Sequence, residues 1–240
     1  MSIPHVIHYC WFGGSQLPPD AERCIASWRK FFPGWEIKRW DESNYNVRAI
    51  PYTAQAYDRH KYAFVSDYAR FDILYREGGV YLDTDVEVIR PFDDIVARGA
   101  FMGMEGAMVN PGLGMGAESG HKLYAEILDK YAAMPFVDAD GRQLPGTVVK
   151  HTTDILATHG YRTDRFMQNV DDITIYPPEF FCPLDDLTGR LHVTPETRSI
   201  HHYAKSWCEG VTPWRTRLSR WSHRVVGFKL SARIKNLLKL

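Results

Sequence analysis

Two carboxylates separated by one residue, Asp83 and Asp85, directly follow the apolar run Val80-Tyr81-Leu82. Side chains two positions apart on an extended backbone point to the same side, so the pair can share one divalent cation. Mg²⁺ and Mn²⁺ accept one or two carboxylates and take further oxygens from a substrate diphosphate. At a strand end of an α/β protein, where ligands usually bind, the pair predicts a nucleotide-diphosphate site.

The same carboxylate spacing recurs at Asp138 and Asp140, in a stretch whose composition is typical of a turn. Spacing alone is therefore a weak signal, and the neighbouring elements decide. Before Asp83, aromatic residues recur every three or four positions over residues 63–77, which predicts a helix with one buried face. Gly78 ends that helix, and a short buried strand follows at once.

This expected helix carries Asp67 and Arg70 at a spacing of three. By spacing alone, the simplest interpretation is a surface ion pair that contributes about 0.2–0.5 kcal/mol. A role for the pair in a binding site depends on the resemblance described below.

The first strand is expected over residues 3–11, and it runs into Trp11-Phe12-Gly13-Gly14. An indole face at a strand end can stack on a nucleobase, and the two glycines let the backbone approach a ligand. By residue type alone, a core tryptophan followed by a turn is the preferred interpretation. A role for Trp11 in nucleotide binding depends on the resemblance described below.

A helix over residues 21–31, opened by two prolines, and a strand over residues 35–40 complete a strand–helix–strand unit with a parallel pair. A further strand is expected over residues 100–104. The glycine-rich segment 110–116 lacks the G-x-G-x-x-G spacing and the P-loop lysine. It is expected either as a flexible loop beside a sugar pocket or as a plain connector. Prolines prevent residues 173–183 from forming a long central strand.

Paired histidines, His201 and His202, follow a short expected strand and precede Lys205, Ser206 and Trp207. A lone histidine is generally structural, but a neutral imidazole can complete the coordination of Mn²⁺ held by two carboxylates and two phosphate oxygens. Lys205 can contact phosphate as a point charge. Because neighbouring strand residues face opposite ways, which histidine would bind the metal stays open.

The chain has 240 residues, of which 45% are hydrophobic and 24% charged, as in an ordinary globular protein with one large α/β domain. Its four cysteines show no C-x-x-C spacing, so neither a zinc site nor a disulfide framework is indicated, and a reducing cytoplasm fits best. No signal-peptide pattern is present at the N-terminus, and no apolar run approaches the ~20 residues that span a bilayer.

Four ordered segments together resemble glycosyltransferase family 32, the family of proteins with a DXD-containing sugar-binding region. These segments are residues 7–14, 66–71, 78–85 and 201–207. The family includes bacterial capsular-polysaccharide and lipooligosaccharide transferases and the fungal Och-type mannosyltransferases. A more distant likeness is to the glucosyltransferase domain of the large clostridial toxins.

The resemblance implies a type-A glycosyltransferase fold: one Rossmann-like α/β domain over residues 1–210, with a mixed, mostly parallel sheet flanked by helices. It implies a nucleotide-diphosphate sugar donor, with a UDP-sugar favoured and a GDP-sugar possible. It also implies Mn²⁺ or Mg²⁺ as cofactor and retention of anomeric configuration.

Pattern and resemblance together assign roles to single residues. Those assigned to catalysis are Asp67, Arg70, Asp83 and Lys205. Those assigned to the donor nucleotide-sugar are Trp11, Gly13, Tyr81, Asn110, Ser206 and Trp207. Those assigned to the metal are Asp83, Asp85, His201 and His202.

The expected reaction is metal-dependent, retaining transfer of a hexose to a glycan or lipid-linked acceptor in cell-surface polysaccharide synthesis. No carboxylate pair for a double displacement stands out beyond the metal-binding aspartates. A same-face, dissociative transfer is therefore expected, with the leaving phosphate taking the acceptor proton. The alternative enzyme is a metal-dependent nucleotide-sugar hydrolase, and a non-catalytic lectin-like module ranks third.

Residues 211–240 carry eight Lys and Arg residues and no Asp or Glu, although the whole chain has a net charge of zero. Apolar residues recur among them at three- or four-residue steps, which predicts a basic amphipathic helical tail. Such a helix could pack on the catalytic domain or bind nucleic acid, but its tryptophans and leucines favour an anionic membrane. We expect no nucleic-acid partner, and we expect a cytoplasmic protein on the inner face of the plasma membrane.

Overall fold

The first three elements form the predicted strand–helix–strand unit. Strand β1 (Val6–Cys10) is followed by helix α1 (Pro19–Phe31) and strand β2 (Glu36–Trp40). Proline stands in the first turn of α1, where an amide hydrogen would have no helical partner. Strand β2 pairs in parallel with β1, which confirms the prediction.

Helix α3 (Tyr62–Glu77) follows α2 (Pro51–Asp58) and leads into strand β3 (Gly79–Tyr81). It ends at Gly78, whose φ of 68° favours glycine. The expectation of a single buried face is wrong. Tyr75, on the expected face, is exposed, whereas residues all around the helix are buried, because α3 packs against α2, β1 and β3 at once.

The remaining elements, in chain order, are β4 (Val86–Val88), α4 (Asp93–Val96), β5 (Phe101–Glu105), β6 (Met108–Ala117), α5 (Lys122–Ala133), α6 (Val148–Thr158), β7 (Gln168–Val170), β8 (Ile173–Tyr176), α7 (Pro178–Phe181) and β9 (Ser199–His201). One seven-stranded sheet has the order β2-β1-β3-β6-β5-β8-β7, in which β6 and β7 run against the other strands. This is the mixed, mostly parallel sheet that was expected. Strands β4 and β9 form a separate antiparallel ribbon.

The glycine-rich segment 110–116, expected as a loop or connector, is instead part of the long strand β6. Two of its glycines, Gly112 and Gly116, lie where neighbouring side chains leave no room for a Cβ atom. A Cβ atom at Gly116 would meet the Phe101 ring at 2.5 Å, and one at Gly112 would meet the Asp83 carboxylate. These glycines therefore permit close packing within a strand, which composition does not distinguish from loop flexibility.

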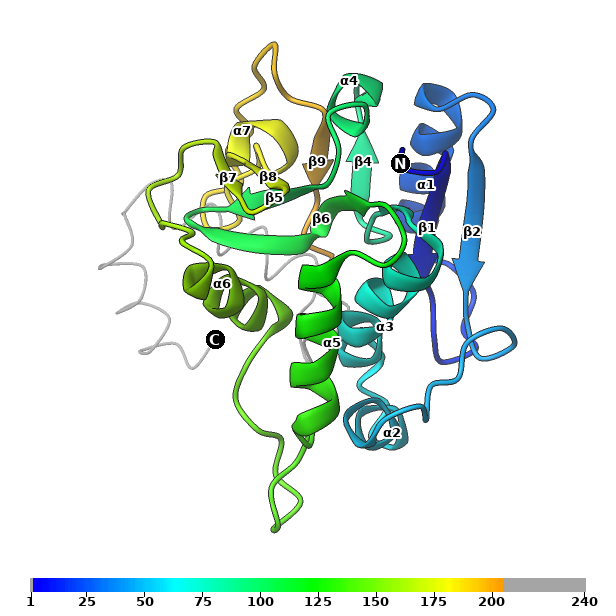
Figure 1. Ribbon diagram of the computed structural model, residues 1–240. Coiled ribbons are helices and arrows are strands. Elements are labelled where there is room, and N and C mark those ends of the chain that lie inside the picture. The colour runs from blue at the N-terminus through cyan, green and yellow to red at the C-terminus, as the bar shows by residue number, and fades with distance from the viewer. Residues whose placement is uncertain (1, 205–240) are drawn as a thin grey trace, which may run out of the picture.

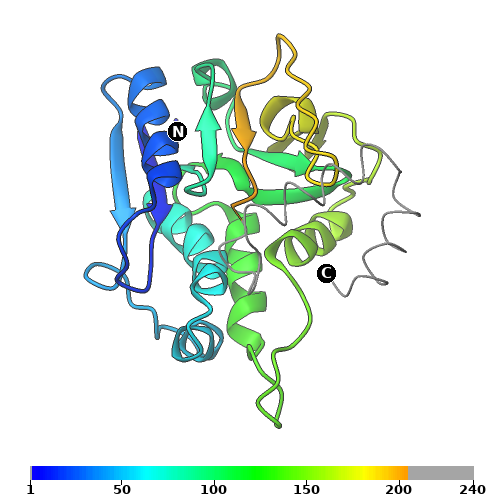
Figure 2. The same ribbon diagram turned by 180° about the vertical axis from the view of Figure 1, so that it is seen from behind.

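Helices cover both faces of the sheet, so that the sheet is the middle of three layers (Figures 1 and 2). One core lies between the sheet and helices α2, α3, α5 and α6. The other lies between the sheet and α1, α4, α7 and the β4–β9 ribbon. Alternation divides β1 between them, since Ile7 and Tyr9 face the second core and Cys10 the first.

The structure describes residues 2–204. The predictions for Lys205, Ser206, Trp207 and the tail 211–240 fall outside these described residues. Within the described part of the chain, no helix has the length and apolar character needed to cross a membrane.

Candidate active site

The carboxyl ends of β1 and β3 lie side by side at one edge of the sheet, because the two strands are parallel neighbours. Trp11 follows β1, and Asp83 and Asp85 follow β3. The neighbouring strand β6 reaches the same edge, where the Gly112 carbonyl accepts the amide hydrogen of Asp83 at 3.0 Å. Three segments thus meet where ligands bind in α/β sheets.

The two aspartates lie on a turn rather than on extended backbone. The amide of Val86 donates to the carbonyl of Asp83 at 3.0 Å and closes this turn. The expectation of an extended D-x-D segment is therefore wrong, and the two carboxylates have different partners. They remain near neighbours, since Asp85 contributes to the electrostatic environment of Asp83.

Asp83, whose side chain is 31% exposed, belongs to an ion-pair network with the buried predicted residues Asp67, Arg70 and Tyr81. The Tyr81 hydroxyl donates to Asp83 Oδ1 at 3.1 Å, and Arg70 Nη2 lies 3.2 Å from the same oxygen. Arg70 Nη2 also lies 3.1 Å from Asp67 Oδ1. The surface-pair interpretation is wrong, because the Arg70 and Asp67 side chains are only 4% and 11% exposed.

Burial and charge act in opposite directions on this network. Burial raises the pKa of Asp67 to about 7, although Arg70 opposes the shift. Burial likewise raises the pKa of Asp83, again against Arg70. Burial acts to lower the pKa of Arg70, but Asp83, Tyr81 and Asp67 outweigh it, so the guanidinium stays charged. A further positive charge at this edge would favour the ionised forms of both carboxylates.

Asp85 is held by the chain segment that follows β9. His201 Nε2 lies 3.3 Å from Asp85 Oδ2, and the amide of Ala204 donates to the same oxygen at 2.8 Å. Burial acts to raise the pKa of Asp85, but its hydrogen bonds lower it below the ordinary value. Burial also acts to lower the pKa of His201, but Asp85 outweighs it and raises that pKa to about 10.

The two histidines face different carboxylates. His202 Nε2 lies 2.7 Å from Glu87 Oε2, away from the pair of aspartates. The register of the β4–β9 ribbon explains this, since His201 pairs with Val86, the residue after Asp85. The structure therefore brings His201, and not the His202 ring, to the predicted site.

The chemistry at this site suits a metal ion that binds together with a ligand, and it does not suit a metal site closed by protein side chains alone. The side chains concerned are those of Asp83, Asp85 and His201. Within residues 2–204, no three His, Cys, Asp or Glu side chains converge on a position that could hold a metal ion by themselves. Mg²⁺ is usually held by one or two carboxylates together with substrate phosphates and water. Carboxylates with a neighbouring imidazole also suit Mn²⁺, which would have to displace the proton that Asp85 stabilises on His201. The chemistry of these side chains thus matches a jointly held cation.

Trp11 is partly buried, and its ring packs on the core beneath α1. Its Nε1 donates to the Ser15 carbonyl at 2.8 Å. At Gly13, the amide donates to Glu42 Oε1 at 2.6 Å, and the Tyr62 ring fills the space of a Cβ atom. Gly13 therefore permits the close approach of the Tyr62 ring. Ligand contacts at Trp11 and Gly13 stay predictions.

Asn110 is buried on β6 and reaches Asp83 indirectly. Its Oδ1 accepts the Gly112 amide hydrogen at 2.8 Å, and Gly112 in turn holds the Asp83 amide. Its Nδ2 donates to Glu105 Oε2 at 2.7 Å. The sequence analysis did not identify Glu105. The only pattern near it is Gly106 between two apolar runs, which is typical of a hairpin turn.

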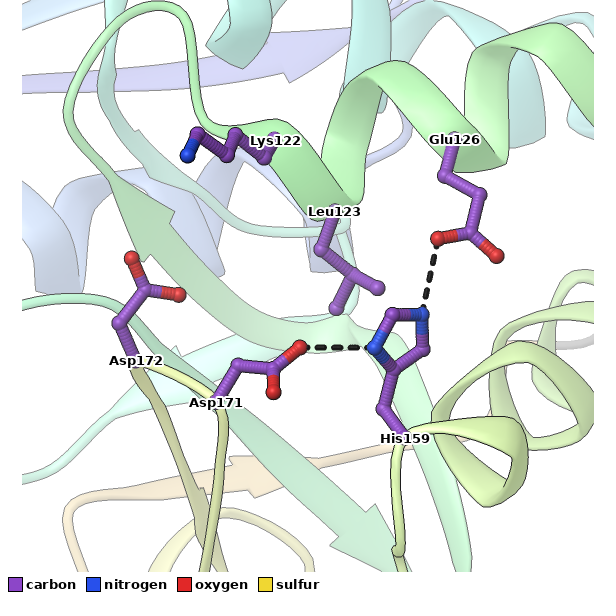
Figure 3. Close-up of a pocket in the computed structure, with 6 residues that line it drawn as sticks. All are labelled: Lys122, Leu123, Glu126, His159, Asp171 and Asp172. Carbon is purple, nitrogen blue, oxygen red and sulfur yellow. Dashed lines mark hydrogen bonds and ion pairs between the residues drawn. The ribbon is translucent and has the colours of Figure 1, made fainter.

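A pocket of about 420 Å³ lies elsewhere, between α5, the end of α6 and the turn before β8 (Figure 3). His159 spans it, with Nε2 2.8 Å from Glu126 Oε2 and Nδ1 2.7 Å from Asp171 Oδ2. Both ring nitrogens are thus engaged and unavailable as base or metal ligand. We therefore locate the candidate active site at Asp83 and Asp85 instead.

Known proteins are similar to this chain over the same region. A family model described as "Glycosyltransferase sugar-binding region containing DXD motif" matches residues 18–102. An uncharacterized glycosyltransferase of Acanthamoeba polyphaga mimivirus is 31% identical over 107 residues, which cover 41% of this chain and 42% of the relative. Inositol phosphoceramide mannosyltransferase 1 of Schizosaccharomyces pombe is 29% identical over 116 residues, which cover 42% of this chain and 33% of the relative.

Among solved structures, the PaToxG glycosyltransferase aligns with a TM-score of 0.50 and 18% identity, over 65% of this chain and 68% of that one. At this identity the likeness concerns the fold, and it confirms the α/β glycosyltransferase fold that was expected. The chain matches less than half the length of the two curated relatives. The match confirms the resemblance seen in the sequence: residues 18–102, which include Asp67, Arg70, Asp83 and Asp85, are similar to the DXD-containing sugar-binding region of glycosyltransferases.

Proposed function

We propose that this protein is a metal-dependent, retaining glycosyltransferase that moves a hexose from a nucleotide-diphosphate sugar to a glycan or lipid-linked acceptor. The observation that carries the proposal is the Asp67–Arg70–Asp83 network beside Asp85 and His201. It lies inside the segment that matches a sugar-binding region. Perturbed carboxylates at a sheet edge are typical of functional sites.

Asp83, Asp85 and His201 would hold Mn²⁺ or Mg²⁺ together with the donor diphosphate. When bound, the cation would neutralise the negative charge that grows on the departing diphosphate. Arg70 is fixed by Asp67 and Asp83, so its charge is preorganised and needs no reorientation during the reaction. Lys205 is proposed from sequence alone as a further contact to phosphate.

In the proposed transfer, the bond between the sugar C1 and the diphosphate oxygen breaks as the acceptor oxygen forms its bond to C1. The acceptor proton passes to the departing phosphate oxygen, on the same face of the sugar. Asp67 and Arg70 would orient the sugar hydroxyls, and Tyr81 keeps Asp83 turned toward them. This scheme requires no covalent sugar–enzyme intermediate, and a trapped adduct with a fluorinated donor would overturn it.

We further propose a cytoplasmic enzyme of cell-surface polysaccharide synthesis, bound to the inner face of the plasma membrane through residues 211–240. The basic, tryptophan-containing composition of that segment supports the proposal. The name of the fission-yeast relative pairs mannose transfer with a ceramide acceptor, which supports a hexose donor and a lipid-linked acceptor. The proposed donor is a UDP-sugar, with a GDP-sugar as the alternative.

A screen of UDP- and GDP-sugars for Mn²⁺-dependent release of nucleotide tests the proposal. We expect release from one donor class, abolished by chelator and stimulated by an oligosaccharide or lipid-linked acceptor. Product analysis then follows the sugar. If every turnover yields free sugar even with acceptors present, the protein is a nucleotide-sugar hydrolase. If sugar binds equally well with chelator and no donor is consumed, a lectin-like module replaces the enzyme.

A further inference from the structure

The loop that follows β1 is held by a side chain from the segment that follows β2. Because β1 and β2 are parallel neighbours, their carboxyl ends lie side by side, and the Trp11 amide donates to the Trp40 carbonyl at 2.8 Å. Two residues further on, the Gly13 amide donates to Glu42 Oε1 at 2.6 Å. A hydrogen bond to an ionised carboxylate is about twice as strong as one between neutral groups, so Glu42 holds the middle of this loop.

The same loop also contacts the ring of Tyr62, the residue at which α3 begins. Gly13 has a φ of 94°, and a Cβ atom added there would overlap the Tyr62 ring. The ring is itself fixed, because its hydroxyl lies 2.9 Å from His60 Nδ1 and the Tyr57 ring packs beside it with centroids 5.5 Å apart. Gly13 is therefore held by a carboxylate through its amide and lies directly against an aromatic ring.

Helix α3 connects this loop to the ion-pair network of the candidate site. Ser66 Oγ donates to the Tyr62 carbonyl at 3.3 Å, and Arg70 Nε donates to the Ser66 carbonyl at 3.1 Å. These three residues follow one another at four-residue steps, so they lie along one face of the helix. Eight residues of helix span about 12 Å, which sets the separation of Tyr62 and Arg70. Gly13 contacts the first of these two residues, and Asp83 pairs with the second.

We propose that Glu42 and Tyr62 are positioning residues, which hold the loop over residues 11–14 in the conformation that receives the nucleoside of the donor. The inference rests on the proposed function and on the predicted contact between Trp11 and the base. A nucleotide-sugar carries its base and its sugar on opposite sides of a diphosphate, so its site needs two groups of side chains at a set separation. Glu42 holds the loop relative to β2, and Tyr62 holds it relative to α3 and therefore to Arg70. Neither residue needs to touch the donor.

Support of this kind matters because the loop contains two adjacent glycines. Gly13 and Gly14 have φ values of 94° and 68°, and glycine loses more conformational freedom on ordering than any other residue. A loop that is already in its bound conformation does not have to be ordered when the ligand binds, and this raises affinity. Loss of either support should therefore weaken the binding of the nucleoside, while the metal and diphosphate contacts proposed at Asp83 stay intact.

Four variants separate the two supports from other roles. Glu42→Ala removes the acceptor of the Gly13 amide hydrogen, whereas Glu42→Gln keeps an acceptor oxygen. Tyr62→Ala removes the ring, whereas Tyr62→Phe removes only the hydroxyl. Titration calorimetry in the presence of Mn²⁺ measures the affinity for UDP or GDP, whichever the wild-type protein binds, and separately for inorganic pyrophosphate, which lacks the nucleoside. Turnover of the matching sugar nucleotide gives kcat and KM.

For Glu42→Ala we expect nucleotide affinity to fall about 3–10-fold, the effect of one net hydrogen bond. We expect a loss of at least that size for Tyr62→Ala, which also leaves a void beside Gly13. In both variants KM should rise by the same factor while kcat stays near the wild-type value, because the reacting end of the donor is held elsewhere. Pyrophosphate affinity should not change. Glu42→Gln and Tyr62→Phe should retain most of the nucleotide affinity.

Two matched controls lie outside the loop. Asp138→Ala removes another carboxylate that accepts backbone amide hydrogens in an exposed turn, and Tyr75→Ala removes an exposed ring near the other end of α3. Both should bind nucleotide as the wild type does, and thermal unfolding shows that each variant is folded. A double variant then tests the route of the effect. In a Trp11→Ala background, Glu42→Ala should cause little further loss of nucleotide affinity, because the two residues act through one loop.

Three results would overturn the positioning role while leaving the proposed function intact. One is normal or increased nucleotide affinity in both Glu42→Ala and Tyr62→Ala. The second is an equal loss of pyrophosphate and nucleotide affinity, which would indicate a general distortion of the site. The third is full additivity of Glu42→Ala and Trp11→Ala, which would make Glu42 a direct ligand of the nucleotide. If the wild-type protein itself binds neither nucleotide with Mn²⁺ and consumes no donor, the proposed function fails, and the positioning role fails with it.

Discussion

Arg70 is the residue on which the candidate site depends most directly, because its guanidinium stands between Asp67 and Asp83 in a buried environment. Removing one member of such a network leaves an uncompensated buried charge, whereas an exposed pair contributes little. An Asp and an Arg at i,i+3 spacing thus affect stability very differently when they are buried than when they form a surface ion pair.

Replacing Asp83 or Asp85 by Asn should lower kcat/KM by at least about 100-fold, because each change removes a charged oxygen from the proposed cation site. Circular dichroism and thermal unfolding should show an intact fold. The control is Asp140→Asn in the other D-x-D sequence, where the Asp138 carboxylate caps the turn by accepting the Asp140 and Arg142 amide hydrogens. Substantial turnover in both site variants at limiting Mn²⁺ would locate the chemistry elsewhere.

Replacing Trp11 by Ala should weaken nucleotide binding by about 1–3 kcal/mol if a base stacks on the indole. Calorimetry of nucleotide binding measures this loss. Trp35→Ala is the matched control. That ring stacks on His5 with centroids 4.5 Å apart, and it precedes β2, at the opposite end of the strands from Trp11. A lower unfolding temperature for Trp11→Ala with unchanged nucleotide affinity would show that the ring is only a core residue.

Among the elements, strand β6 places Gly112, which has no side chain, against the candidate site. Gly112→Ala would place a methyl group against Asp83 and Arg70. We expect it to destabilise the fold by about 1–3 kcal/mol, as overpacking does, and to weaken nucleotide and Mn²⁺ binding together. Denaturant unfolding and calorimetry measure the two effects.

Gly160→Ala is the control for backbone strain, because its φ is 94° and an added Cβ meets no atom within 4 Å. This variant should lose stability while binding nucleotide normally. Unchanged Mn²⁺ and nucleotide affinity in Gly112→Ala would mean that β6 does not shape the site.

His159 connects α5, the end of α6 and the turn before β8 through Glu126 and Asp171. The Glu126 hydrogen bond raises the pKa of His159 against the opposing effect of burial, and Asp171 adds to the rise. A raised histidine pKa stabilises the fold below the ordinary value of about 6.5, and that contribution is lost as pH rises through the folded-state pKa. The other charged groups lining the pocket are Lys122 and Asp172.

We therefore expect His159→Gln to remove part of the decline in unfolding free energy as the pH rises above about 6.5. Urea unfolding at several pH values measures this difference. Identical pH slopes for the variant and the wild type would mean that the ion pairs contribute nothing, as is common for exposed pairs.

Within the described residues, the large sheet and the β4–β9 ribbon both contribute to the candidate active site. The proposed membrane attachment depends on residues 211–240. Truncation after Glu209 should release the protein from anionic vesicles at moderate salt, because each Lys or Arg near such a surface contributes about 1 kcal/mol. Metal-dependent turnover of a soluble acceptor should be spared. Sedimentation with vesicles checks this, and a truncated protein that still sediments, or a full-length chain that never does, would contradict it.

The elements whose signals are local could be predicted from the amino-acid sequence. Prolines at the start of α1, Gly78 at the end of α3 and the apolar run before Asp83 act within a few residues, so pattern and composition locate them. The order of helix, glycine break, strand and D-x-D also identified the sugar-binding region. These features depend on backbone propensity and side-chain period, which a linear chain displays.

Which residues surround the two aspartates depends on the tertiary structure. His201 rather than His202 faces Asp85, and Ala204 bonds to Asp85 from 119 positions away. Segment 110–116 lies in a strand because β6 pairs with β3 and β5, and Asp83 and Phe101 occupy the space that Gly112 and Gly116 leave beside it. Such facts follow from strand register and close packing between distant segments, and both depend on the complete fold rather than on any local pattern.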